Sequence, residues 1–155
     1  MPRLRLAVLA AALLALAACE PSSAGAAANG SRDGVAGTGY LLRVRGTREC
    51  APTALYPAPR SRRWVGVELE LEATGAHAVP ASFYYARVVD SAGRSYESAP
   101  GPCAPPLRHA PLTRGARALG WASFAIDTQA TGLELRFAPR LPVAPSEELR
   151  LALGS

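Results

Sequence analysis

Hydrophobic and polar residues alternate along several short runs of this chain. The clearest run is RWVGVELELEA, residues 63–73, in which every second residue from Val65 to Leu71 is aliphatic. The alternate positions of the same run carry three glutamates, Glu68, Glu70 and Glu72. A period of two places alternate side chains on opposite faces of a β-strand. The run therefore predicts a strand with one buried and one solvated face. A metal site on the glutamate row is the less favoured reading, because solvated sheet faces show the same pattern.

Six further runs have the composition or the alternation of strands. They are residues 38–49, 83–90, 94–98, 117–127, 133–139 and 147–153. No stretch after the N-terminal segment repeats apolar residues with the period of an amphipathic helix. Short strands separated by turn signals are typical of two packed sheets, so the pattern predicts an all-β, immunoglobulin-like β-sandwich of about seven strands.

Three of these runs allow a prediction of which face is buried. In residues 83–90 we expect Tyr84, Ala86 and Val88 to point inward, because the other face would bury Arg87. In residues 117–127 the inward positions are Ala122, Phe124 and Ile126. In residues 133–139 they are Leu133, Leu135 and Phe137.

The segments between the runs are predicted to be loops. Residues 50–59 and 99–111 are rich in proline, which cannot donate a hydrogen bond within a sheet. Residues 74–82, TGAHAVPAS, carry turn-forming residues. Residues 91–93, SAG, are predicted to form the turn of a hairpin between two of the strands.

The N-terminus has the organisation of a bacterial export signal. Two arginines within residues 1–5 precede thirteen apolar residues, 6–18. A membrane-spanning helix needs about 20 apolar residues, so this run predicts a cleaved signal peptide over residues 1–18. The stretch LAAC, which ends at Cys19, resembles the lipobox of bacterial lipoproteins. That resemblance implies that Cys19 is acylated and becomes the first mature residue. The alternative is ordinary cleavage after Ala17 or Ala18, which would leave Cys19 without lipid.

The segment after Cys19 lacks any apolar face. Residues 20–37 are small and polar, and with the lipidated cysteine we expect them to form a flexible linker over 19–37, ahead of a sandwich domain over 38–155. Glu20 follows the cysteine where an aspartate would favour retention in the inner membrane of proteobacteria. The resemblance therefore implies an outer-membrane anchor, with the domain facing the periplasm or the cell surface.

Composition and charge exclude several kinds of chemistry. All seventeen basic residues are arginine. The chain therefore cannot provide a phosphate-loop lysine or a Schiff-base lysine. The formal net charge is +5, and two of these charges lie in the signal segment. This mild charge gives no support for a nucleic-acid partner.

Three motifs resemble a bacterial extracytoplasmic immunoglobulin-like domain of unknown function, which is common in lipoproteins and similar in fold to a mycobacterial secreted immunoprotective antigen. The motif residues are Asp90, Gly93 and Tyr96, then Gly120, Trp121, Phe124 and Ile126, then Leu133, Leu135 and Phe137. The resemblance covers residues 38–155. It implies a sandwich fold and transfers no catalytic residue. The chain departs from the family at Asp127, where proline is common.

Two cysteines remain after Cys19 is assigned to the anchor. Cys50 and Cys103 both follow predicted strands and lie in proline-rich segments. Free cysteines tend to pair in the oxidising compartment that an exported protein reaches, so we expect a Cys50–Cys103 disulfide. A redox pair is the alternative, but the sequence has neither a CxxC spacing nor an activating neighbour.

Two further groups of residues could carry a function. Arg60, Arg62 and Arg63 precede Trp64, and guanidinium groups beside an aromatic ring could bind an anionic partner; a solvated loop is the simpler reading. His77 and His109 are the only histidines, and nothing in the sequence pairs them with a nucleophile.

These observations together predict a lipid-anchored, non-catalytic binding or assembly module of the cell envelope, with no cofactor and no metal. Its partners would be the membrane, through the lipid on Cys19, and an envelope protein or an anionic polymer. One alternative is an anion-binding envelope stress lipoprotein that uses Arg60, Arg62 and Arg63. A small envelope hydrolase is the other.

Overall fold

The computed structural model of the protein describes residues 27–29, 34–145 and 147–154. The predicted signal peptide and Cys19 lie outside these residues. Among the residues that are described, no helix is long and apolar enough to cross a membrane.

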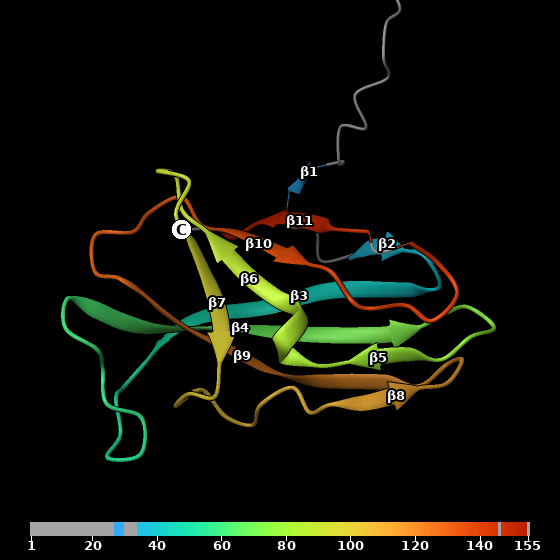
Figure 1. The fold of residues 1–155 in the computed structure, drawn as a ribbon, viewed down its shortest axis with the longest axis horizontal. Coiled ribbons are helices and arrows are strands. Elements are labelled where there is room, and N and C mark those ends of the chain that lie inside the picture. Colours follow the sequence, from blue (N-terminus) through green and yellow to red (C-terminus); the bar gives the residue numbers. More distant parts are fainter. Residues whose placement is uncertain (1–26, 30–33, 146, 155) are drawn as a thin grey trace, which may run out of the picture.

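Two layers of strands form the body of the molecule (Figure 1). The long sheet contains, in order, β9 (Arg117–Asp127), β4 (Arg62–Ala73), β3 (Tyr40–Cys50) and β2 (Val35–Gly37). The short sheet contains β7 (Ser95–Ala99), β6 (Ala86–Val89), β10 (Glu134–Phe137), β11 (Leu149–Ala152) and β1 (Ala27–Asn29). A separate two-stranded ribbon consists of β5 (Val79–Ala81) and β8 (Ala110–Leu112).

Strand β7 joins the two layers. It pairs with β6 through Ser95–Glu97 and with β9 through Ser98 and Ala99. The strands of both layers therefore belong to one hydrogen-bonded series, and the chain of paired strands passes from one layer to the other at β7. The prediction of an all-β sandwich is confirmed, although the described residues form more strands than the seven expected, and four of them (β1, β2, β5 and β8) are only three residues long.

The core lies between the two layers and contains the residues that alternation placed there. Val65, Val67, Leu69 and Leu71 of β4 and Ala122, Phe124 and Ile126 of β9 are buried. The short sheet contributes Ala86, Val88, Leu135, Phe137 and Leu151 from the opposite side. One face of each sheet is thus removed from water. This burial of apolar side chains is the main contribution to the stability of such a fold.

The outer face of the long sheet carries the glutamate row of β4. Its residues face away from the core as predicted, yet Glu70 is only 8% exposed. Arg43 and Arg45 of the neighbouring strand form ion pairs with Glu70, and Arg43 also pairs with Glu72. The row therefore forms cross-strand ion pairs rather than a free carboxylate surface.

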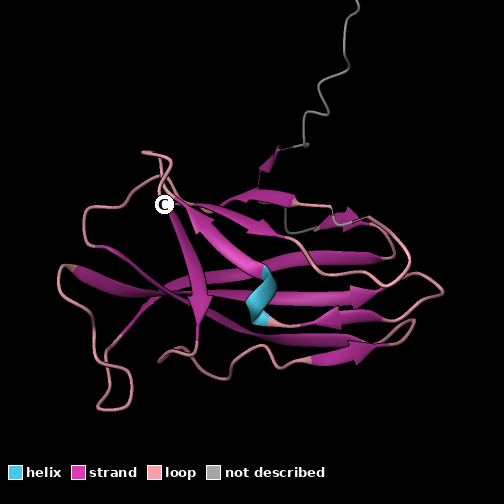
Figure 2. Ribbon diagram, viewed as in Figure 1, coloured by secondary structure: helices cyan, strands magenta, loops and turns pink. Residues whose placement is uncertain are grey.

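The predicted inward position of Tyr84 is wrong. Residues Phe83–Tyr85 form a single 3-10 turn, η1, which Figure 2 shows between β5 and β6. The Ser82 hydroxyl caps this turn by accepting a hydrogen bond from the Tyr84 amide. A turn of three residues breaks the two-residue alternation, so the Tyr84 side chain is 61% exposed. Ala86 and Val88 begin the true strand and are buried as predicted.

Three other assignments need correction. Residues 79–81 and 110–111 fall in predicted loops, but they pair within β5 and β8, with Pro80 opposite Pro111. Prolines are tolerated here because each strand of the two-stranded ribbon has one edge without a neighbouring strand, where no backbone N–H is needed for pairing. Residues 27–29 and 35–37 fall in the predicted linker, but their backbones pair as β1 with β11 and as β2 with β3. The ordered sheet therefore begins before residue 38.

The turn after β6 explains the first family-like motif. Asp90 is buried, and its carboxylate accepts hydrogen bonds from the amides of Ala92 and Arg94, from the Arg94 Nε and from the Tyr96 hydroxyl, at 2.8–2.9 Å. Gly93 has φ +80, a backbone conformation that side chains disfavour. Asp90, Gly93 and Tyr96 thus define one hydrogen-bonded turn. Asp127 forms an ion pair with Arg94, which gives the unusual residue at that position a structural role.

We expect the stability of the protein to fall in acid through Asp90. Burial raises the pKa of its carboxyl group, but the hydrogen bonds from Arg94 and Tyr96 outweigh burial and hold the pKa below the ordinary 3.8. A lowered pKa stabilises the fold above the unfolded value, and this stabilisation is lost as the pH falls through the folded value. Urea denaturation between about pH 5 and about pH 2 should show a flatter pH dependence for Asp90→Asn than for the unmodified protein. Identical pH dependence in the two proteins would contradict this.

Candidate functional site

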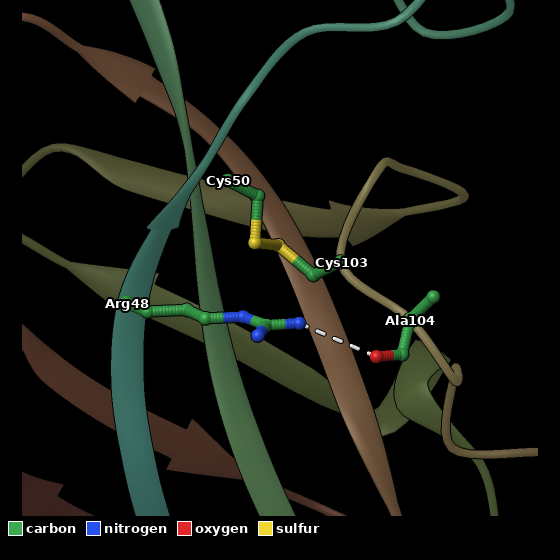
Figure 3. Close-up of a disulfide and its surroundings, with 4 residues drawn as sticks. All are labelled: Arg48, Cys50, Cys103 and Ala104. Carbon is green, nitrogen blue, oxygen red and sulfur yellow. Dashed lines mark hydrogen bonds between the residues drawn. A yellow bond between two sulfur atoms is a disulfide. The ribbon is translucent and has the colours of Figure 1, made fainter.

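A second apolar cluster lies on the outer face of the long sheet, around a disulfide. A β-bulge between Val44 and Gly46 shifts the register of β3, so Cys50 lies opposite Trp64 and on the same outer face. Cys50 and Cys103 form the predicted disulfide, with their Cα atoms 5.6 Å apart (Figure 3). Trp64 and Trp121 pack with them in this cluster. The disulfide thus fastens the proline-rich loop after β7 onto the sheet.

Polar contacts also hold this proline-rich loop against the sheet. The Arg48 guanidinium lies 4.1 Å from the centre of the Trp121 ring and donates to the carbonyl of Ala104 (Figure 3). A Cβ atom at Gly66 would lie 2.6 Å from the Cys103 Sγ, so only glycine lets the loop approach so closely. The cluster is a closed structural element with no free thiol.

The predicted arginine cluster is dispersed by the strand that carries it. Arg62 and Arg63 are successive residues of β4 and so point to opposite faces. Arg62 lies 3.6 Å from Asp127, and Arg63 lies 3.1 Å from Glu49. Arg60 is exposed in the preceding turn, while Trp64 is buried beside the disulfide. The structure does not bring these four predicted side chains together.

Arg63 does line a cavity at the open end of the sandwich. The cavity has a volume of about 390 Å³ and an apolar floor that includes Val65, Leu133 and Leu153. The guanidinium of Arg63 is held by Glu49 and by the carbonyl of Ala130. Both hydrogen bonds go to groups of the protein itself, so Arg63 mainly closes this end of the core.

The two histidines are kept apart by the β5–β8 ribbon. His77 precedes β5 and His109 precedes β8, and the two strands are antiparallel, so the histidines lie at opposite ends. Both are exposed. Within the described parts of the chain, no group of three or more His, Cys, Asp or Glu residues could hold a metal ion.

A concave surface lies on the outer face of the short sheet. We call it the short-sheet groove; its volume is about 520 Å³. Its ionisable lining residues are Arg87, Glu97, His109, Arg136, Arg140 and Glu148, and its aromatic residues are Tyr84 and Tyr85. A volume of this size is typical of sites for small ligands. Sequence analysis did not identify this site.

Strand register assembles the charged floor of the groove. Arg87 faces Glu97 on one side and Arg136 on the other. Arg136 in turn faces Arg150 of β11. Like charges on directly opposite residues destabilise a sheet. Glu148 relieves this repulsion, because its carboxylate contacts all three arginines.

The arginines also set the charge state of Glu148. Partial burial raises the pKa of its carboxyl group, but the hydrogen bond from Arg87 and the charges of the arginines outweigh burial, so the pKa lies below its ordinary value. Glu148 is therefore a hydrogen-bond acceptor at neutral pH. The groove thus presents fixed donors and fixed acceptors side by side.

The aromatic edge of the groove follows from the 3-10 turn. The Tyr84 ring lies 4.2 Å from the Phe83 ring, between centroids, at an interplanar angle of 36°. The stacked rings and the Ser82 cap hold Tyr84 in place while its side chain stays 61% exposed. An exposed tyrosine supported in this way offers a large contact area at little cost in conformational entropy.

Comparison with known proteins identifies the fold. No family model matches the sequence, and no curated protein sequence is significantly similar to it. Among solved structures, YcdA of Bacillus subtilis, titled a "putative lipoprotein", superposes with a TM-score of 0.64 at 11% identity over 79% of this chain. The matched part is 39% of YcdA, so the chain spans well under half of that protein.

Two further structures have the same architecture. YjhA of Bacillus subtilis matches with a TM-score of 0.57 at 15% identity, over 75% of this chain and 92% of its own. The secreted protein MPT63 of Mycobacterium tuberculosis matches with a TM-score of 0.50 at 14% identity, over 75% of this chain and 81% of its own. The chain shares their fold. The predicted fold similarity to a mycobacterial secreted protein is thereby confirmed, and at such low identity the likeness concerns the fold alone.

Proposed function

We propose that the protein is a lipid-anchored, extracytoplasmic module that binds a component of the cell envelope and catalyses no reaction. The observation that carries the binding function is the short-sheet groove. It combines a supported aromatic ring, Tyr84, with charged groups of both signs on a rigid sheet. Binding sites on secondary structure are held more accurately than sites on loops.

Export is supported by the disulfide and by the sequence of the N-terminus. Structural disulfides form and persist in oxidising compartments outside the cytoplasm. Cys50 and Cys103 form such a bond. The apolar segment 6–18 and the lipobox-like LAAC at Cys19 add an export signal and an acylation site. YcdA and MPT63, which share the fold, bear the descriptions putative lipoprotein and secreted protein.

The alternatives have less support. An anion site built from Arg60, Arg62 and Arg63 would need Arg62 and Arg63 on one face, but they are successive residues of β4 and point to opposite faces. A hydrolase would need a nucleophile with an activating base. His77 and His109 lie at opposite ends of the ribbon, so the two histidines do not converge on one site.

Acylation and location can be tested by expression in a bacterial host that processes lipoproteins. We expect the protein to incorporate an alkyne-labelled fatty acid and to sediment with the membrane fraction, where Glu20 favours the outer membrane. Cys19→Ser should abolish labelling and release the chain from the membrane. A double variant, Cys50→Ala with Cys103→Ala, is the matched control and should retain the label. Isolated protein that carries no label and still begins at Met1 would contradict the proposal.

A further inference from the structure

We infer that the ligand of the short-sheet groove is a saccharide that bears a carboxylate group. This inference rests on the proposed binding function and names the ligand class. It combines three features of the groove: an exposed aromatic face, donors together with acceptors, and an arginine that is available for an anion.

The aromatic face favours a ring-shaped, partly apolar ligand. Sugar rings have faces of C–H groups, which pack on the electron-rich face of an aromatic ring. Tyr84 is 61% exposed and is supported from behind by Phe83, so its ring can take such a contact without being reordered. An inorganic anion or a polyphosphate would gain nothing from this surface.

The mixture of charges favours a ligand with hydroxyl groups. Arg87 and Arg136 can only donate hydrogen bonds, whereas the carboxylates of Glu97 and Glu148 accept them. A hydroxyl group both donates and accepts, so a saccharide can satisfy both kinds of residue. A phosphate-rich polymer only accepts, and the two carboxylates would repel it.

Arg140 supplies the specificity for a carboxylate. It lines the groove and is exposed, and among the described residues it has no ion-pair partner, unlike Arg87 and Arg136. The planar guanidinium group matches a carboxylate with two parallel hydrogen bonds. The lining also carries one more arginine than carboxylates, so a single negative charge on the ligand would balance it.

The test is calorimetric titration of the full mature protein in detergent with methyl galacturonoside and with methyl guluronoside, each of which carries a single carboxylate. We expect at least one of the two to bind, and dextran, an uncharged saccharide, to bind much more weakly. Tyr84→Ala and Arg140→Ala should each weaken the binding by about tenfold, the effect of losing one good charged or aromatic contact. Tyr84→Phe keeps the ring and should retain most of the affinity.

Two matched variants control for nonspecific effects. Leu55→Ala changes a side chain that is 76% exposed on another loop, and Arg60→Ala removes an exposed arginine of the other candidate cluster. Both should bind like the unmodified protein. Three results would overturn the inference: no binding of either uronate, equal binding of linear polyphosphate through Arg140, or loss of binding in Arg60→Ala but not in Arg140→Ala.

The titration and the fractionation separate the two proposals. An acylated, membrane-bound protein that binds neither uronate would contradict the ligand class and leave the anchored module standing. An unacylated cytoplasmic chain that binds a uronate through Tyr84 and Arg140 would contradict the proposed location and leave the ligand class standing.

Discussion

Replacing Cys50 and Cys103 together with alanine is expected to lower the free energy of unfolding by about 4 kcal/mol. The disulfide joins residues that are 53 positions apart. Opening so long a loop in the unfolded chain raises its conformational entropy, and the chain-entropy relation gives about 4 kcal/mol for this length. The disulfide also fastens the proline-rich loop over Trp64 and Trp121, so its loss should weaken the packing of these two side chains as well.

Urea denaturation followed by tryptophan fluorescence measures this effect, because both tryptophans belong to the cluster. Reduction of the unmodified protein with dithiothreitol should lower the midpoint to nearly the same value as the double alanine variant. The variant Cys19→Ser keeps the disulfide, so its midpoint should equal that of the unmodified protein without reductant and should fall by the same amount with reductant. A double variant as stable as the unmodified protein would show that the loop is held by its other contacts alone.

Replacing Leu107 with alanine should cost about 3 kcal/mol, although this residue lies outside every strand. Its side chain is fully buried in the main core. The backbone beside it is fixed to β9, since the Leu107 amide donates to the Trp121 carbonyl at 3.0 Å and the Trp121 amide donates to Pro105. Truncation should therefore leave a cavity that the loop cannot easily collapse to fill.

Leu55→Ala provides the matched comparison, because the same change is made at a leucine that is 76% exposed on the loop between β3 and β4. Its free energy of unfolding should change by less than about 0.5 kcal/mol. Equilibrium denaturation of the two variants side by side measures the difference. Equal effects would mean that the segment around Leu107 does not belong to the core.

The long strands could be predicted because alternation and burial agree in them. In β4 and β9 every second residue faces the core, and their paired length is set by that pattern. The disulfide was also predictable, since an exported chain with two remaining cysteines has one intramolecular pairing available. The spacing of Asp90, Gly93 and Tyr96 is visible in the sequence, but only the hydrogen bonds to the Asp90 carboxylate show what these residues do together.

Short elements held by backbone pairing were not predictable. Strands β2, β5 and β8 are each three residues long, too short to show a period, and two of them contain proline. Tyr84 was misplaced because one 3-10 turn shifts the phase of the alternation within a run that otherwise reads as a strand. In each case the information lies in the neighbouring strand rather than in the local sequence.

The groove could not be predicted for a related reason. Its residues come from several separate segments, and each of Arg87, Arg136 and Arg150 looks like an ordinary outward residue of its own strand. Only the register between β6, β10 and β11 places them side by side. The sequence does show arginines at outward positions of these three strands. This pattern indicates a shared site only once the three strands are known to be neighbours.

The pairing of β1 with β11 limits how far the domain can move from the bilayer. Ala27 is the eighth residue after Cys19, and a fully extended chain covers at most about 3.5 Å per residue. With a lipid on Cys19, the edge of the short sheet would stay within about 28 Å of the membrane surface. The proposed anchor would therefore be a short tether that keeps the domain in the layer of the envelope next to the membrane. A ligand of the domain would have to be present in that layer.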